Sequence, residues 1–104
     1  MIVLLSYLFA WRAAAGGHSE VVALLLADTA VDPDAPDATG VTPLIAACAH
    51  GRAAVAERLI DANADVEHRS YGEGGWTPLV AAAAGGHFAA AALLLARGAS
   101  ANAP

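Results

Sequence analysis

"GVTPLIAACAHG" at residues 40–51 returns as "GWTPLVAAAAGG" at residues 75–86, and this recurrence decides the fold. Gly17, Gly51 and Gly86 each follow a helix-like segment, so the chain repeats itself at intervals of 34 and 35 residues. The two intervals differ only in the stretch before each Thr-Pro pair. A fixed period of this length is the signature of stacked supersecondary units. The sequence therefore predicts a repeat protein whose insertions fall in one loop of the unit.

Each unit carries the signals of two short antiparallel helices. Thr42 is a good N-cap, and the proline after it suits the first helical position, where its missing N–H would be unpaired anyway. These signals predict a first helix over about 43–49 and a second over about 53–61. Asn63 and Gly98 suit the left-handed conformation that ends a helix. Because helices this short are marginal alone, each pair must pack against its neighbours.

The composition agrees with thin, closely packed layers of helices. Hydrophobic residues make up 58% of the chain, yet 29 of the 104 residues are alanine and only six are aromatic. Alanine is the best helix former and adds little thickness between helices. The net charge is −5 and lysine is absent, which argues against nucleic acid as a partner, because phosphate binding depends on clustered cations.

The cysteine count and the N-terminal residues bear on location. Cys48 is the only cysteine, so no intramolecular disulfide can form, which favours a reducing, intracellular and cytoplasmic location. The apolar run at 1–11 is similar to the core of a secretory signal, but no basic residue precedes it and it is shorter than the about 20 residues that span a bilayer. A buried first helix is favoured, and no membrane partner is expected. A secreted or anchored form is the alternative if residues 1–15 act as a signal.

Several linked motifs at fixed offsets resemble the ankyrin-repeat family, whose unit of about 33 residues has a Thr-Pro-Leu-His-x-Ala core. Residues 42–47 and 77–82 match this core except at the histidine. The family's Gly-His turn appears at 17–18 and 86–87 and, altered, at 51–52. The resemblance covers about residues 8–104. It implies an all-α ankyrin-repeat solenoid of about three helix-turn-helix units joined by β-turn or finger loops. One domain over 1–104 is expected, with units at about 5–36, 37–69 and 70–104.

The chain departs from the family pattern at two places. Trp11, Ile45 and Val80 replace the motif histidine, so we expect the hydrogen bonds that it makes between units to be absent and apolar packing to substitute. The last unit has no polar cap and ends in "GASANAP" at 98–104. This ending suggests either a fragment of a longer array or an apolar end face that pairs with something.

The four histidines do not form a metal site in this arrangement. His18 and His87 occupy equivalent turns two units apart, roughly 16–20 Å from each other at a layer spacing of about 8–10 Å. One zinc ion cannot join them, because its ligands lie about 2 Å away. A structural role is favoured, in which each imidazole ties down a turn through backbone hydrogen bonds. His68 is expected to be solvated.

Other candidate motifs also lack the partners that their chemistry needs. The acidic run at 32–37 has neither the glycine turn nor the bidentate glutamate of a calcium loop, so a solvated acidic loop is favoured. The glycine-rich stretch at 71–76 is not a P-loop, because the chain has no lysine. Cys48 lies inside a predicted helix, where a small buried thiol is ordinary. We therefore predict no enzyme activity, no cofactor and no metal.

With no catalytic or metal site expected, the surface of the chain is the remaining candidate for function. By resemblance, the chain binds proteins along a concave face made from loop tips and the exposed edges of first helices. Trp76 has two interpretations of equal weight, a binding anchor or packing on its own loop and the next unit. For His50 ordinary exposure is favoured. We predict a non-enzymatic module that binds another protein, and the alternative is a structural spacer, or a fragment of a longer array, that self-associates through uncapped apolar ends. The residues placed on the binding face are Thr39, Val41, Ala49, His50, Tyr71, Glu73 and Trp76.

Overall fold

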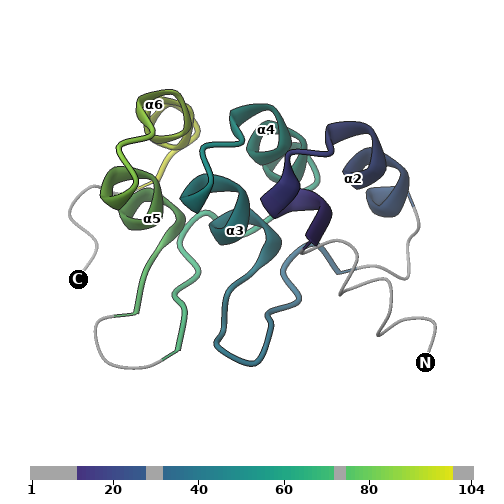
Figure 1. Cartoon of the computed structure of the whole chain (residues 1–104), viewed down its shortest axis with the longest axis horizontal. Helices are drawn as coiled ribbons and strands as arrows, with labels where there is room; N and C mark the ends of the chain where they lie inside the picture. Colours follow the sequence, from purple (N-terminus) through teal and green to yellow (C-terminus); the bar gives the residue numbers. More distant parts are fainter. Residues whose placement is uncertain (1–11, 28–31, 72–74, 100–104) are drawn as a thin grey trace.

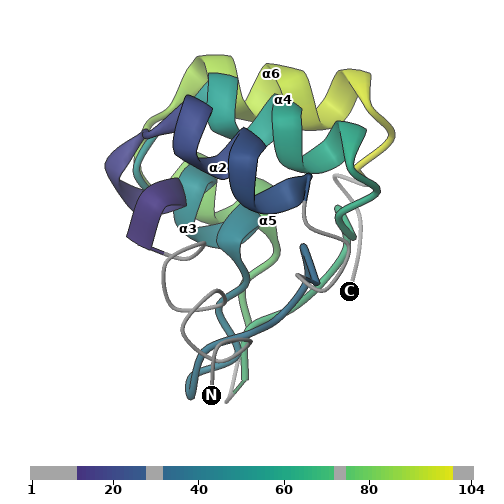
Figure 2. The same ribbon diagram turned by 90° about the vertical axis from the view of Figure 1, so that its right-hand side faces the viewer.

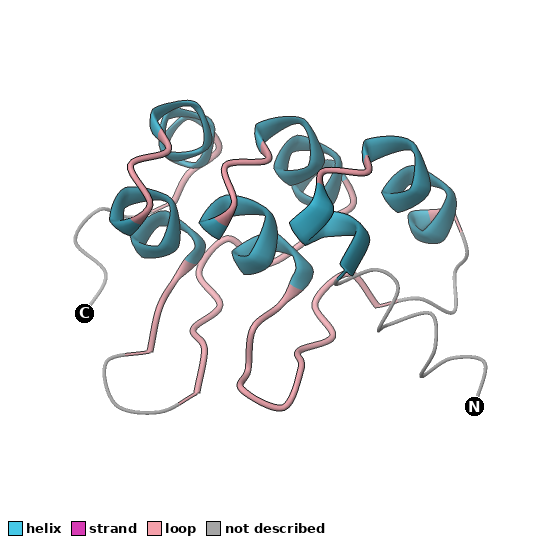
Figure 3. Ribbon diagram, viewed as in Figure 1, coloured by secondary structure: helices cyan, strands magenta, loops and turns pink. Residues whose placement is uncertain are grey.

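The computed structural model describes residues 12–27, 32–71 and 75–99 (Figure 1). These residues form helices and loops, and none of them lies in a β-strand (Figure 3). The predicted all-α repeat fold is confirmed. Residues 12–16 form a first short helix. The helices that follow are α2 (Ser19–Leu26), α3 (Pro43–Ala49), α4 (Ala53–Asp61), α5 (Pro78–Ala84) and α6 (Phe88–Ala96).

The helices form two rows (Figures 1 and 2). The outer row consists of α2, α4 and α6, and the inner row consists of residues 12–16, α3 and α5. Within the rows, α3 packs on α5, and α4 packs between α2 and α6. Each inner helix and the outer helix after it form one layer, and the long axis of 37 Å runs along the stack of layers. The loops that join one layer to the next project together from the inner row (Figure 1).

Threonine caps begin α3 and α5. The Thr42 hydroxyl accepts a hydrogen bond from the backbone N–H of Ile45 at 3.3 Å, and Thr77 caps Val80 in the same way at 3.2 Å. Both threonines are buried, so an unpaired amide at either place would be costly. A proline follows each cap at the start of the helix. The predicted start of α3, the first helix of its unit, is confirmed.

A glycine in the left-handed conformation ends each of these inner helices. Gly51 has a φ of 70° and Gly86 a φ of 72°. Beyond Gly51, the N–H of Arg52 returns to the carbonyl oxygen of Ala47 at 2.8 Å, and the same bond recurs one layer later. This turn reverses the chain into the outer helix. Asn63 has a φ of 70° and ends the second helix of its layer, as its sequence position predicts.

Alanine recurs at one buried position of the inner row, and leucine recurs at one buried position of the outer row. Ala13, Ala47 and Ala82 occupy the same position in three successive layers, and each of them is buried. Leu59 and Leu94 are the corresponding large side chains of α4 and α6. All five belong to one continuous hydrophobic cluster that runs through the stack. Alanine is therefore part of the core at this inner-row position, where its small side chain adds little thickness between neighbouring helices.

Two side chains at equivalent positions link neighbouring layers. Arg52 Nε donates to the carbonyl oxygen of Ala15 at 3.2 Å, and His87 Nε2 donates to that of Ala49 at 3.0 Å. Neither side chain stands at the position of the motif histidine, so apolar packing is not the only contact between layers: the turn adds hydrogen bonds of its own. His87 ties its turn to the preceding layer. The expected apolar packing is also present, since Ile45 is only 3% exposed.

Candidate functional site

The loop between α2 and α3 ends in a tight tip that one carboxylate organises. The N–H of Asp37 donates to the carbonyl oxygen of Val41 at 3.0 Å. The Oδ1 atom of Asp37 accepts from the Thr39 N–H at 2.8 Å, from the Thr39 hydroxyl at 2.7 Å and from the Val41 N–H at 3.0 Å. Burial acts to raise the pKa of Asp37, but these hydrogen bonds outweigh it and lower that pKa. The tip, which we call finger 1 (residues 37–41), is therefore ordered by its own hydrogen bonds.

The loop between α4 and α5 carries a second finger, which we call finger 2 and which the structure describes at residues 70–71 and 75–76. Ser70 and Trp76 pair at its base, where the Ser70 N–H donates to the Trp76 carbonyl oxygen at 3.0 Å. In return, the Trp76 N–H donates to the Ser70 hydroxyl at 2.9 Å. These two bonds fix the backbone of Trp76 relative to the returning chain.

The two fingers are joined to each other. The N–H of Tyr71 in finger 2 donates to the carbonyl oxygen of Thr39 in finger 1 at 2.9 Å. Gly40 makes this approach possible, because a Cβ atom there would lie 2.5 Å from the Tyr71 backbone and ring. The side chains of Tyr71 and Trp76 nevertheless stay 61% and 47% exposed. The fingers thus hold two aromatic side chains at the surface, on backbone segments that are hydrogen-bonded to each other.

Carboxylates also link the loops nearer to the helices. Asp34 Oδ1 accepts from the backbone N–H of Asp65 in the next layer at 2.8 Å, and Asp65 Oδ1 accepts from the N–H of Glu67 at 2.9 Å. Burial raises the pKa of Asp34, although the Asp65 N–H acts in the opposite direction. The expectation of a simply solvated loop at 32–37 is wrong at Asp34 and Asp37, because both are half-buried and accept backbone hydrogen bonds.

His68 also differs from its prediction. The residue is half-buried, and its Nε2 atom is inaccessible to solvent without a hydrogen-bond partner among the described residues. Its expected solvation is wrong because the loop that carries it is held against the preceding layer through the Asp34–Asp65 bond.

The structure brings part of the predicted binding face together. Thr39, Tyr71 and Trp76 are exposed on the fingers, and Val41 is half-buried at the end of finger 1. Ala49 and His50 lie at the other end of α3, where the Ala49 carbonyl oxygen accepts from His87. Glu73 lies outside the described residues. Because α3 is buried from its first residue to Cys48, this helix offers little exposed edge.

Sequence reasoning missed the residues that order the fingers. Asp37 and Ser70 were not among the predicted site residues, although both fix the backbone that carries the exposed side chains. The Asp37-Ala38-Thr39 order is a signal for an Asx turn, in which a carboxylate accepts from the N–H two residues on, and it could have identified Asp37. Nothing local marks the pairing of Ser70 with Trp76.

Three further features of the described residues bear on chemistry. Cys48 is buried, and burial raises the pKa of its thiol to about 12, which keeps it protonated at neutral pH. Among the described parts of the chain, no three or more His, Cys, Asp or Glu side chains gather as metal ligands would. No described helix has the length and apolar character that crossing a bilayer requires.

Stacked helix pairs with left-handed glycine turns and projecting fingers define the class of α-solenoid repeat proteins. A family model for ankyrin repeats, in three copies, matches residues 10–104, and the chain belongs to the ankyrin-repeat family. A comparison with curated proteins found no match. Ankyrin repeats are generally protein–protein interaction modules.

Proposed function

We propose that the chain binds another protein through its two fingers, with Tyr71 and Trp76 as the main contacts. The observation that supports this proposal is the hydrogen bond from the Tyr71 N–H to the Thr39 carbonyl oxygen, which joins the fingers beneath exposed aromatic side chains. A backbone ordered before binding loses less conformational entropy on association. Aromatic side chains dominate binding energy where they become desolvated.

The proposed role is non-enzymatic and intracellular. Its non-enzymatic character is supported by the family, whose members are typically interaction domains, and by the Cys48 thiol, whose raised pKa makes it a poor nucleophile. An intracellular location is supported by the single cysteine, which a reducing compartment keeps as a thiol.

The test compares proteins captured from an extract of the native cell on three immobilised forms of the chain. These are the wild type, Trp76→Ala, and Ala54→Glu, which changes an exposed residue on the outer row away from the fingers. We expect mass spectrometry to find at least one protein that the wild type and Ala54→Glu retain and Trp76→Ala loses. Equal retention by all three forms would contradict a finger-based site.

A stability measurement separates binding from packing at Trp76. Because about half of its surface is exposed, Trp76→Ala should leave the melting temperature nearly unchanged while it weakens binding to the captured partner. If the variant instead melts at a clearly lower temperature and its affinity per folded molecule persists, Trp76 packs on its own loop.

A further inference from the structure

The last layer exposes a surface that the middle layer buries. Ile45 on α3 is 3% exposed, whereas Val80, its equivalent on α5, is 45% exposed. The layer formed by α5 and α6 packs on α3 and covers Ile45, and no described residue covers Val80. We call this side of a layer its forward face. Neither α5 nor α6 contains a charged residue, and a helix that is apolar all round is normally buried.

The opposite end of the stack exposes the complementary surface. Val55 on α4 and Ala90 on α6 are buried against the layer that precedes each of them. Val21 on α2 occupies the same position in the first layer, and it is exposed. We call this side of a layer its backward face. The two halves of the contact that joins successive layers are therefore both free, one at each end of the described stack.

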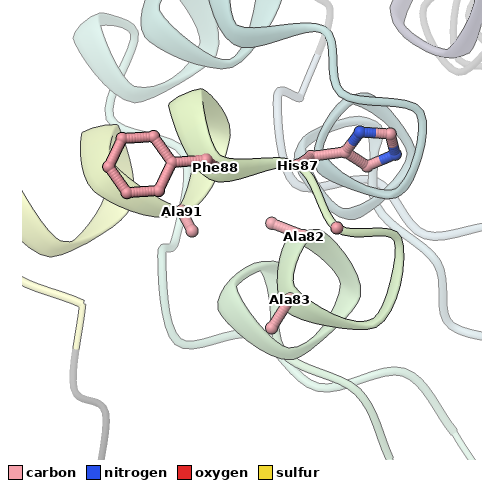
Figure 4. A pocket seen from close by; sticks show the side chains of 6 residues that line it. Ala82, Ala83, His87, Phe88 and Ala91 are labelled. Carbon is pink, nitrogen blue, oxygen red and sulfur yellow. The ribbon is translucent and has the colours of Figure 1, made fainter.

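A hollow on the forward face marks where a side chain of a further layer would fit. Arg52 fills the space beside Gly17, and His87 fills the space beside Gly51, but no atom lies within 4 Å of a Cβ placed on Gly86. Figure 4 shows side chains that line this hollow, with the rings of His87 and Phe88 pointing in opposite directions. The hollow is lined by Ala82, Ala83, Gly86, His87, Phe88 and Ala91.

The chain carries a side chain that matches this hollow. His18 is the first-layer equivalent of Arg52 and His87, it is exposed, and its ring has no hydrogen-bond partner among the described residues. The carbonyl oxygens of Ala15 and Ala49 accept from Arg52 and His87. The equivalent carbonyl oxygen belongs to Ala84, and no described residue bonds to it across layers. His18 of a second copy could therefore donate to the Ala84 carbonyl oxygen, as Arg52 and His87 donate to the equivalent oxygens within the chain.

Side chains of the outer row at the two ends of the stack also match each other, through apolar contact rather than a hydrogen bond. Arg58 Nε donates to the Ser19 hydroxyl, which joins α4 to α2. The equivalent of Arg58 on the free backward face is Leu24, and the equivalent of Ser19 on the free forward face is Phe88. Leu24 and Phe88 are 74% and 83% exposed. The polar pair at the junction of the first two layers is thus replaced by two apolar side chains, one at each end of the described stack.

We propose that copies of this chain stack end to end, with the backward face of one copy on the forward face of the next. In this arrangement His18 of one copy lies beside Gly86 of the other, and Leu24 packs against Phe88. The contact continues the interface that already joins the layers within one chain. It is a head-to-tail contact between different surfaces, so it can extend beyond two copies. The proposal uses no finger residue and stands apart from the proposed binding function.

The test uses two substitutions that each block one end. Leu24→Glu places a charge on the backward face and Phe88→Glu places one on the forward face, and both positions are exposed enough for the single chain to fold. Light scattering over a dilution series should show the wild-type mass rising above the 10.4 kDa of one chain as concentration increases. Each variant alone should stay at the mass of one chain. An equimolar mixture of the two should form a dimer, because each variant keeps the face that the other lacks.

Two controls keep the result specific to the ends. Ala89→Glu adds a charge on α6 at a position equivalent to the exposed residues Glu20 and Ala54, and it should associate as the wild type does. Trp76→Ala should also associate normally, since the fingers are not involved. A wild-type chain that stays at the mass of one copy at millimolar concentration would overturn the proposal. Dimers of Leu24→Glu alone would also overturn it, because they would show a symmetric contact between forward faces.

Discussion

Two aspartates of the same loop affect stability in opposite ways. Asp37 accepts three hydrogen bonds within finger 1, and these lower the pKa of its carboxyl. Asp34 is half-buried, and burial together with the charges of Asp32 and Asp65 raises the pKa of its carboxyl, against the effect of the Asp65 N–H and of nearby His68. The first residue therefore stabilises the fold as a carboxylate, and the second stabilises it more in its neutral form.

Asp37→Asn should lower the free energy of unfolding at pH 7 by up to about 1 kcal/mol, because a neutral amide accepts hydrogen bonds less strongly than a carboxylate. The folded pKa of Asp37 lies below the ordinary value of 3.8, so its contribution is present above that value and is lost as the pH falls through the folded pKa. Urea unfolding at pH 7 and pH 3 should therefore show a smaller difference from wild type at pH 3. A constant difference would mean that the charge of Asp37 does not matter.

Asp34→Asn should have the opposite sign. The amide oxygen can still accept from the Asp65 N–H, while the charge that burial disfavours is removed. The wild-type group contributes most below its ordinary pKa of 3.8, and this contribution is lost as the pH rises through the raised folded pKa. We expect the variant to be at least as stable as wild type at pH 7, with the difference disappearing by pH 3. A clear loss of stability at pH 7 would show that the carboxylate form is needed.

Residues that act on their own neighbours were predictable from the sequence, and residues that act across layers were not. The cap at Thr42 and the left-handed Asn63 follow from local chemistry. The hydrogen bonds of Arg52, Asp34 and Tyr71 each join segments 31 to 37 residues apart. Such bonds depend on how one layer sits on the next, which no single unit of sequence specifies. The burial of His68 was missed for the same reason.

At the scale of the element, the observed bounds of α3 and α4 coincide with the predicted ranges 43–49 and 53–61. Thr-Pro fixes the start of the inner helix and a left-handed glycine fixes its end, so both boundaries are coded locally. The exposed edge expected for the inner helix was not found on α3, because the neighbouring layers cover it. Exposure is a property of the stack rather than of the helix.

Gly51→Ala and Gly86→Ala separate backbone strain from contact between layers. Both glycines are left-handed, so each substitution should cost about 1–2 kcal/mol of unfolding free energy. At Gly51 the new methyl group would also lie 2.5 Å from the His87 ring, whereas at Gly86 it would meet nothing within 4 Å. Chemical denaturation of dilute samples should therefore show the larger loss for Gly51→Ala. Equal losses would indicate that the His87 ring moves aside without cost.

At the scale of the whole molecule, no layer is thick enough to be stable alone, so the layers are expected to unfold together. Leu59 lies in the middle layer at 1% exposure, and Leu59→Ala should cost about 2–5 kcal/mol. That is a large part of the about 5–15 kcal/mol available to a typical domain. Unfolding followed by circular dichroism and by tryptophan fluorescence should give one coincident transition at a lower urea concentration. Separate transitions would show that the ends of the stack unfold independently.

Because Cys48 is buried, the rate at which its thiol reacts can report how often the chain opens transiently. A maleimide can alkylate this sulfur only while the middle layer is open, since the thiol is fully buried and stays protonated in the closed form. The alkylation half-life, read by intact mass, would therefore report how often that layer opens under native conditions. A partner or a second copy that holds the layers closed would lengthen this alkylation half-life.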